Sequence, residues 1–223
     1  MVSTRFTDRS GGVSKPPYGS FNLASHVGDD GESVRLNREL LTDAVGPTAF
    51  MSQVHGDTVV VVDGIPAVEP IADALVTQQS GIALAVLVAD CIPLLLWDEM
   101  SACIGAVHVG RRGLVNGITD KVLALMEAMG ATSIRAHLGP SICGRCYEVG
   151  SDVYQEVGDQ YSAARSKTSD GALALDLPTA LAGELTNRGV HTSQSHLCTV
   201  ENADYFSYRR DGITGRQAGV IWL

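Results

Sequence analysis

Apolar residues recur along the chain with two periods, which predict helices alternating with mostly short strands. Apolar positions spaced three or four residues apart predict helices over 34–45, 114–129, 151–158 and 178–188. Apolar and β-branched runs predict strands over 48–54, 57–62, 72–77, 82–89, 92–97, 103–109, 134–138, 191–195 and 217–223. Hairpin-like strand pairs with few helices between them favour an α+β fold with mixed β-sheets over a regular doubly wound α/β fold.

Local signals give these elements their bounds. Ser33 is the expected N-cap of the first helix, and Gly46-Pro47 ends it. The run over 82–89 is apolar throughout, which is typical of a strand buried on both faces. Polar, glycine-bearing segments over 9–31 and 204–215 are expected to be loops, the second a functional one. No repeat or linker divides the chain, so we expect a single domain over residues 1–223.

Composition argues against several functional classes. Lys and Arg total 16 against 25 Asp and Glu, and the net charge of −9 disfavours a general nucleic-acid or anionic-membrane binder. An anionic small molecule needs only a few local cations and stays compatible. Five cysteines are an odd number in a chain too long to need covalent staples, so we expect reduced thiols. With no apolar targeting segment and no membrane-length apolar run, we expect a cytoplasmic soluble protein.

Three candidate site residues stand next to the ends of predicted strands. His55 lies between two strands, Cys91 follows the buried run over 82–89, and His108 lies near the end of the strand over 103–109. Two histidines and a cysteine can form a three-ligand zinc site with one position open, or a thiol nucleophile with its base. The alternative is one buried thiol and two structural histidines, and the spacing alone does not decide between them.

Other chemistry-bearing residues allow more than one interpretation. Arg111 and Arg112 stand between a strand and a helix, where they suit phosphate or carboxylate recognition, or else a solvated, ion-paired surface. Cys143-Gly144-Arg145-Cys146 is a Cys-x-x-Cys without a second pair, so we interpret both cysteines as structural. Cys103 and Cys198 are expected to be core or loop thiols.

Short segments spread along nearly the whole chain match one known family in type and order. They are Phe21-Asn22-Leu23, His26-Val27-Gly28-Asp29-Asp30, Gln53-Val54-His55-Gly56, Ala72-Asp73-Ala74, Ala89-Asp90-Cys91-Ile92-Pro93, Gly105-Ala106-Val107-His108, Arg112-Gly113, Leu138-Gly139-Pro140-Ser141-Ile142, Cys146-Tyr147-Glu148-Val149, Phe206-Ser207-Tyr208-Arg209-Arg210-Asp211-Gly212 and Thr214-Gly215-Arg216. Through them the chain resembles the YfiH family, also called the laccase-domain or multicopper polyphenol oxidase-like family.

The resemblance implies a fold, a metal and an activity. The implied fold is a four-layer α/β/β/α arrangement with mixed β-sheets, similar to the cytotoxic necrotising factor catalytic domain. The implied metal is zinc on His55, Cys91 and His108. The implied activity is that of a purine nucleoside phosphorylase, which converts inosine, adenosine or methylthioadenosine and phosphate to a free base and a pentose 1-phosphate. Adenosine deaminase activity is attributed to the family as well.

The expected site roles rest partly on the resemblance and partly on the residue pattern, which supplies the role of Arg112. Catalysis is assigned to Cys91, His55, His108 and Arg112, with Arg112 holding phosphate near the ribose carbon. Substrate contacts are assigned to Asn22, His26, Gln53, Asp73, Ser207, Arg209 and Arg210. The expected partners are nucleoside and phosphate, without nucleic acid or membrane, and the expected assembly is a monomer or homodimer. The family usually has Trp where this chain has Arg111, which bears on substrate preference more than on metal binding.

The histidine count bears on the laccase label. A blue-copper centre alone uses two histidines and a cysteine, and a trinuclear copper cluster needs several more, typically in His-x-His pairs. The chain has six histidines and no His-x-His; they are His26, His55, His108, His137, His191 and His196. Copper stays an alternative metal for a single site, but a multicopper centre is not expected.

Two further functions compete with the zinc phosphorylase. Some bacterial family members resemble editing factors that remove a wrong amino acid from a nucleotide-linked muramyl precursor. In that case Cys91 would be the nucleophile of a metal-free amide hydrolase, with His108 or His55 as its base. The last alternative is a non-enzymatic module that binds a nucleoside or a partner.

Overall fold

Two β-sheets pack against each other in the computed structural model, which describes residues 1–223. The six-stranded mixed sheet comprises, in spatial order, β11 (His191–Gln194), β8 (Arg135–Leu138), β6 (Ile92–Asp98), β7 (Cys103–Val109), β4 (Ala74–Thr77) and β3 (Val59–Val61). The four-stranded sheet comprises β1 (Ser3–Phe6), β12 (Gln217–Trp222), β5 (Ala83–Val88) and β2 (Thr48–Ala49). A separate hairpin pairs β9 (Arg165–Lys167) with β10 (Leu173–Leu175).

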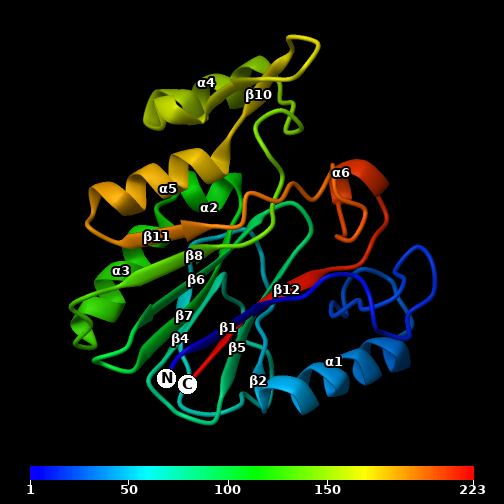
Figure 1. Cartoon of the computed structure of the whole chain (residues 1–223), viewed down its shortest axis with the longest axis vertical. Helices are drawn as coiled ribbons and strands as arrows, with labels where there is room; N and C mark the ends of the chain where they lie inside the picture. Colours follow the sequence, from blue (N-terminus) through cyan, green and yellow to red (C-terminus); the bar gives the residue numbers. More distant parts are fainter.

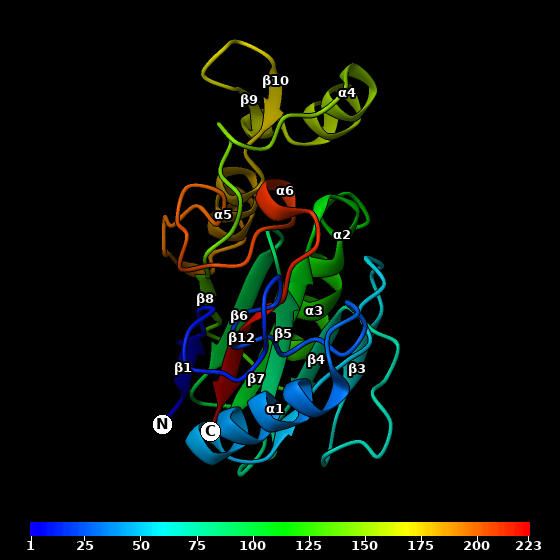
Figure 2. The ribbon, with the colours of Figure 1, turned by 90° about the vertical axis from the view of Figure 1, so that its right-hand side faces the viewer.

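Helices cover the outer faces of the two sheets. The helices are α1 (Gly31–Val45), α2 (Arg111–Val115), α3 (Ile118–Ala128), α4 (Ser151–Gln160), α5 (Leu177–Asn187) and α6 (Tyr208–Asp211), with a short 3-10 turn over Ser162–Ala164. Helices α3 and α5 pack on the six-stranded sheet, and α1 lies along the four-stranded sheet at the other side of the molecule (Figures 1 and 2). The predicted four-layer α/β/β/α arrangement with mixed sheets is confirmed.

Strand β5 shows how the apolar pattern builds two of the cores. All six of its residues are buried. Its even-numbered residues, such as Leu84, join the core between the two sheets, and its odd-numbered residues, such as Leu87, pack with Leu41 of α1. Because successive side chains of a strand point to opposite faces, only a run that is apolar throughout can serve both cores. The third core lies between the six-stranded sheet and α3 and α5.

Several predicted bounds differ from those in the structure. The helix over 114–129 is interrupted, because Gly117 takes a left-handed φ of 73° between α2 and α3, a conformation that glycine adopts without steric penalty. The N-cap of α1 is Asp30, whose carboxylate accepts the Ser33 backbone N–H at 2.9 Å. The predicted strand over 48–54 keeps only β2, and the chain then leaves the sheet and forms the loop that carries His55.

The sequence pattern did not predict strand β1 or the hairpin β9–β10, although it did predict helix α4. Strand β1 is mostly polar, and it forms because it pairs antiparallel with β12, which brings the two termini side by side (Figure 1). The hairpin β9–β10 and helix α4 stand together at one end of the molecule, beyond α5 and α6 (Figure 2).

None of the helices combines the length and the apolar character needed to cross a membrane.

Candidate functional site

His55, Cys91 and His108 come together from three separate segments. Cys91 lies between β5 and β6, His108 is in β7, and His55 is in the loop between β2 and β3. Their ligand atoms all lie within 4.8 Å of one another, with Cys91 Sγ 3.9 Å from His55 Nε2. The two imidazole rings meet edge to face with centroids 4.6 Å apart. The structure thus brings together all three predicted ligands.

Asp73 positions two members of this cluster, His55 and His108. Its side chain is fully buried, and Oδ1 lies 2.8 Å from His108 Nδ1. The same carboxylate accepts the backbone N–H groups of His55 at 2.9 Å and Gly56 at 2.7 Å. These bonds fix His55 in the left-handed region, with φ 59°, which a non-glycine residue rarely adopts. One carboxylate therefore orients the His108 ring and holds the loop that presents His55.

Two backbone features bring the cluster close together. A Cβ added at Gly110 would stand 3.1 Å from Cys91 Sγ and 3.3 Å from His55 Cδ2, so any side chain there would crowd the cluster. Asp90, just before Cys91, has a φ of 91°. Its carboxylate accepts the Thr199 hydroxyl and the Arg209 backbone N–H, each at 2.7 Å. Asp90 therefore ties the Cys91 segment to the start of α6.

The electrostatics of the cluster favour a thiolate. Burial disfavours the charged thiol of Cys91, but the positive charge and the hydrogen bond of His108 outweigh burial and lower its pKa to about 6. Burial likewise disfavours charge on His108, but the Cys91 thiolate and Asp73 raise its pKa to about 9. Without a metal, Cys91 and His108 therefore form a thiolate–imidazolium pair at neutral pH, with the imidazolium also bonded to Asp73.

The cluster lies in a pocket of about 390 Å³, a volume typical of small-molecule sites. Its apolar wall includes Ile142, Leu177 and Pro178, and the aromatic rings of Tyr147 and Tyr208 also line it. The tyrosine rings and the apolar side chains thus offer flat, apolar contact area close to the three candidate ligands. Such a wall suits a planar heterocycle.

Three arginines line the same pocket, namely Arg111, Arg209 and Arg216. Arg111 is paired with Glu156 at 2.7 Å. The guanidinium of Arg209 donates to the Glu148 carbonyl at 2.8 Å, and that of Arg216 donates to the carbonyls of Thr214 and Gly215. Carbonyl partners leave the charge of Arg209 and Arg216 available to an anion.

Only some of the predicted substrate contacts line the pocket. His26, Gln53 and Arg209 do. Gln53 also exchanges two hydrogen bonds of 2.8 Å with the backbone of Leu87, which fixes its amide at the pocket edge. Burial and the nearby Arg216 lower the pKa of His26, which keeps its ring neutral at pH 7.

The remaining predicted substrate residues lie outside the pocket. Asn22, Asp73 and Ser207 are fully buried. Asn22 accepts the Arg216 backbone N–H at 2.9 Å, and Ser207 caps α6 by accepting from Arg210 N at 3.2 Å. The Arg210 guanidinium binds carbonyls of the loop over 199–205. These residues support the pocket from behind.

Arg112, the predicted phosphate-holding residue, is exposed and does not line the pocket, whereas its neighbour Arg111 does. Adjacent residues of a helix point about 100° apart, so only one of the two can face the pocket.

Arg216 and Tyr147 line the pocket but were not among the predicted site residues. Both lie inside segments that match the family, Thr214-Gly215-Arg216 and Cys146-Tyr147-Glu148-Val149. Those segments were the available signal, because neither residue stands out by charge or spacing alone. Burial acts against the charge of Arg216 and lowers its pKa, as expected for a cation that faces a largely apolar pocket.

The donor set fits a metal ion. Two imidazoles and one thiolate match the ligands and the open fourth position of catalytic zinc sites, and a single copper ion uses the same donor types. The Asp73–His108 contact is the carboxylate–histidine pair that usually orients a metal-bound imidazole. With Nδ1 bonded to Asp73, Nε2 of His108 is the atom directed at the cluster.

Comparisons with known proteins agree with this geometry. Residues 3–223 match the sequence family described as multi-copper polyphenol oxidoreductase laccase. A protein of Corynebacterium glutamicum named a purine nucleoside phosphorylase is 46% identical over 98% of this chain and 93% of its own length. The Escherichia coli purine nucleoside phosphorylase YfiH is 38% identical over 100% of this chain and 94% of its own length.

Solved structures give the same result. A Neisseria meningitidis protein of family DUF152 superposes with a TM-score of 0.92 at 39% identity, covering 100% of this chain and 94% of that one. The Bacillus licheniformis hypothetical protein YfiH superposes with a TM-score of 0.92 at 30% identity, covering 100% of this chain and 92% of that one. Matched from end to end in sequence and in fold, the chain belongs to the YfiH, or laccase-domain, family.

Proposed function

We propose that this protein is a zinc-dependent purine nucleoside phosphorylase that acts on inosine, adenosine and methylthioadenosine. The observation that carries the proposal is the convergence, in one pocket, of the His55–Cys91–His108 cluster with Arg209 and Arg216, whose guanidinium groups donate to backbone carbonyls. Full-length relatives that are named purine nucleoside phosphorylases support the same conclusion.

Phosphorolysis requires the pocket to bind phosphate, to bind the purine and to let the leaving purine take up a proton. A phosphate oxygen forms a bond to the ribose C1′, and the C1′–N9 bond breaks with its electron pair moving to the purine, which must take up a proton. In the proposed arrangement Arg209 and Arg216 bind the phosphate, and Tyr147 and the apolar wall bind the purine. Neutral His26 offers a hydrogen bond at the edge of the pocket.

Zinc held by His55, Cys91 and His108 would supply a Lewis acid at an open coordination position within this pocket. Asp73 keeps the His108 ring in the tautomer that directs Nε2 at the cluster, and it holds the His55 loop. Adenosine deamination at the same site is part of the proposal; it consumes water in place of phosphate, breaks the bond between the purine ring and its amino group, and gives inosine and ammonia.

A product assay tests the proposal. Purified protein is incubated with inosine, with and without phosphate, and hypoxanthine and ribose 1-phosphate are separated by chromatography. We expect both products only with phosphate, no turnover in Cys91→Ser, and turnover in Cys103→Ala, whose thiol lies in the helix-covered core of the six-stranded sheet. An inosine-induced rise in melting temperature without products would instead indicate a binding module.

One observation favours a second function, amide hydrolysis. Cys91, His108 and Asp73 are placed as a nucleophile, its base and a carboxylate that orients the base. Burial acts to raise the pKa of the Cys91 thiol, but the effect of His108 is larger and the pKa falls to about 6. This arrangement could release an amino acid from a muramyl precursor in metal-free protein. Chelated protein that releases serine from a nucleotide-linked muramyl-serine precursor, and loses this activity when zinc is added, would support the hydrolase over the phosphorylase.

A further inference from the structure

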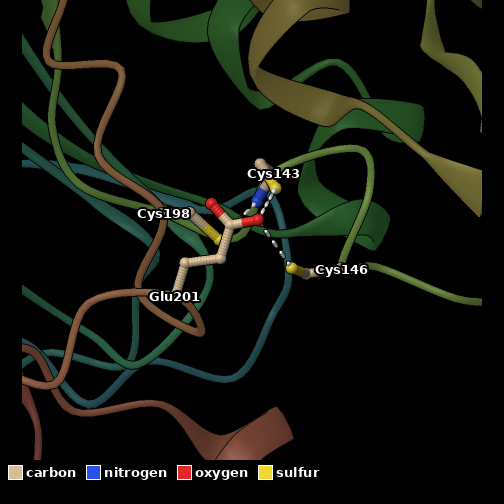
Figure 3. Close-up of side chains that lie close together, drawn as sticks. All are labelled: Cys143, Cys146, Cys198 and Glu201. Carbon is tan, nitrogen blue, oxygen red and sulfur yellow. Dashed lines mark hydrogen bonds between the residues drawn. The ribbon is translucent and has the colours of Figure 1, made fainter. Parts of the chain in front are cut away.

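A second cluster of metal-binding side chains lies outside the pocket. Its members are Cys143, Cys146, Cys198 and Glu201, whose ligand atoms all lie within 4.8 Å of one another (Figure 3). The sequence shows a Cys-x-x-Cys without a second pair of cysteines. Folding supplies the second pair as Cys198-x-x-Glu201, from a loop more than fifty residues further along.

We propose that these four side chains bind a Zn²⁺ ion in a closed structural site separate from the pocket. In a tetrahedral zinc site with thiolate and carboxylate ligands, sulfur atoms lie about 3.8 Å apart and a sulfur and an oxygen about 3.5 Å apart. Glu201 Oε1 lies 3.6 Å from Cys146 Sγ and 4.0 Å from Cys143 Sγ. The carboxylate and the thiols thus already stand close to the edges of such a tetrahedron.

The local backbone presents the two thiols of the first pair to the same space. The N–H groups of Cys146 and Tyr147 both donate to the Cys143 carbonyl, at 3.0 and 3.1 Å, which closes a tight turn. Gly144 is required in this turn, because a Cβ there would stand 2.6 Å from Asp176 Cβ. Such turns are typical of the Cys-x-x-Cys half of structural zinc sites.

The second pair is presented in a related way. Cys198 is buried, and its sulfur accepts the Cys143 backbone N–H at 3.4 Å, the kind of outer hydrogen bond that supports a metal-bound thiolate. The Asn202 N–H donates to the Cys198 carbonyl at 3.0 Å, so Glu201 lies within a turn that starts at Cys198. Figure 3 shows the Glu201 carboxylate between the thiols of the two loops.

The charge balance also suits a divalent cation. Three thiolates and one carboxylate would carry four negative charges, and zinc would neutralise half of them. The Arg145 guanidinium lies 3.4 Å from Glu201 Oε1 at the exposed side of the cluster. It is an outer counter-charge, and because both partners are exposed its pairing with Glu201 is weak enough not to prevent zinc binding.

The proposed zinc would join two loops that build the pocket. The loop over 139–150 carries Tyr147, and the loop over 195–207 leads into α6, which carries Arg209. Backbone bonds of 3.2 Å already connect Ser141 to Leu197 and Thr199, and the zinc would lie at the end of this contact. Its role is therefore to position the pocket wall, and it takes no direct part in the reaction.

Metal counting tests the proposal. Protein is equilibrated with Zn²⁺ under reducing conditions, freed of unbound metal, and analysed by mass spectrometry for zinc per chain. We expect about two zinc ions in the wild type, and about one each in Cys143→Ser/Cys146→Ser and in Cys91→Ser, since the two variants empty different sites. Cys103→Ala is the matched control and should keep both, because its thiol belongs to neither cluster.

A cobalt spectrum gives a readout that does not depend on stoichiometry. Co²⁺ bound by three thiolates gives a stronger near-ultraviolet charge-transfer band than Co²⁺ bound by one, so most of the band should disappear in Cys143→Ser/Cys146→Ser and persist in Cys91→Ser. Glu201→Gln, at an exposed position that does not threaten folding, should release zinc to a chelator faster than the wild type. A zinc count that stays the same in the double variant, or a Cys143–Cys146 disulfide in protein purified under reducing conditions, would overturn the proposal. A single zinc that is lost in the double variant and kept in Cys91→Ser would instead support it and count against zinc in the pocket.

Discussion

Replacement of Asp73 by asparagine should damage both stability and metal binding, although Asp73 touches neither pocket nor metal. The carboxylate is fully buried and accepts from His108 Nδ1, from the backbone N–H groups of His55 and Gly56, and more weakly from that of Val54. An asparagine has only one accepting oxygen. Whichever way its amide is turned, two of these groups face an NH₂ donor in place of an acceptor.

The magnitude follows from the two orientations. If the amide nitrogen faces Gly56, the partly buried backbone N–H groups of Gly56 and Val54 lose their acceptor, at about 1–3 kcal/mol together. If it faces His108 instead, the imidazole must hold its proton on Nε2, and that nitrogen can no longer bind a metal. We therefore expect Asp73→Asn to lower the free energy of unfolding by about 1–3 kcal/mol and the zinc affinity by about 10- to 100-fold.

Two assays measure these effects. Urea denaturation gives the change in unfolding free energy, and competition with a calibrated chelator gives the zinc affinity. Asp57→Asn is the matched control: this half-exposed carboxylate pairs with Lys121 at the surface, so its loss should cost no more than about 1 kcal/mol. If Asp73→Asn does not fold, His108→Gln tests the metal arm alone. Unchanged stability together with unchanged zinc affinity in Asp73→Asn would refute the reasoning.

Three further predictions concern the pocket. In metal-free protein, alkylation of Cys91 by iodoacetamide should titrate near pH 6 and be fast at pH 7, because His108 overcomes the burial penalty and lowers the pKa of the thiol; a midpoint near the ordinary value of about 8.5 would contradict this. Gly110→Ala should weaken zinc binding in chelator competition, since its Cβ would press on Cys91 and His55; an unchanged affinity would show that the cluster has room to spare. In phosphorolysis kinetics, Arg209→Ala should raise the KM for phosphate about tenfold or more, whereas Arg112→Ala should leave it unchanged; the reverse pattern would restore the phosphate role that the sequence assigned to Arg112.

The parts of the fold that could be predicted from the sequence are those encoded locally. The run over 82–89 is apolar at every position, and it is indeed a strand that serves two cores. Strand β1 is a counter-example, because its polar residues become a strand only through pairing with β12 at the other end of the chain. The break at Gly117 was also missed, since the apolar stripe continues across α2 and α3.

The candidate site likewise contains residues that could be identified from the sequence and residues whose placement could not. His55, Cys91 and His108 were recognisable because each is a metal-ligand type at a strand end, and the structure brings them together. Asp73 was predicted to contact substrate, but the structure places it fully buried outside the pocket lining, because a sequence does not show that a carboxylate points into the protein. Which of two adjacent arginines faces the pocket depends on where helix α2 begins, and an error of one residue there exchanges Arg111 for Arg112.

The second cluster escaped for a different reason. The sequence contains no second Cys-x-x-Cys, because the partner pair is one cysteine and one glutamate, separated from the first pair by α4, β9, β10, α5 and β11. A glutamate is common at protein surfaces and carries no signal by itself. Only the contact between the loops over 139–150 and 195–207 identifies it as a candidate ligand.

The central claim is that zinc at His55, Cys91 and His108 supports phosphorolysis in this pocket. The most direct measurement is to strip the protein with a chelator, return Zn²⁺ in steps, and follow hypoxanthine formation from inosine and phosphate against the zinc bound. Cys91→Ser is titrated in parallel. We expect no turnover in the stripped protein, a rate that rises with zinc and saturates, and no recovery in Cys91→Ser. Full turnover in the stripped protein, or equal recovery in Cys91→Ser, would contradict it.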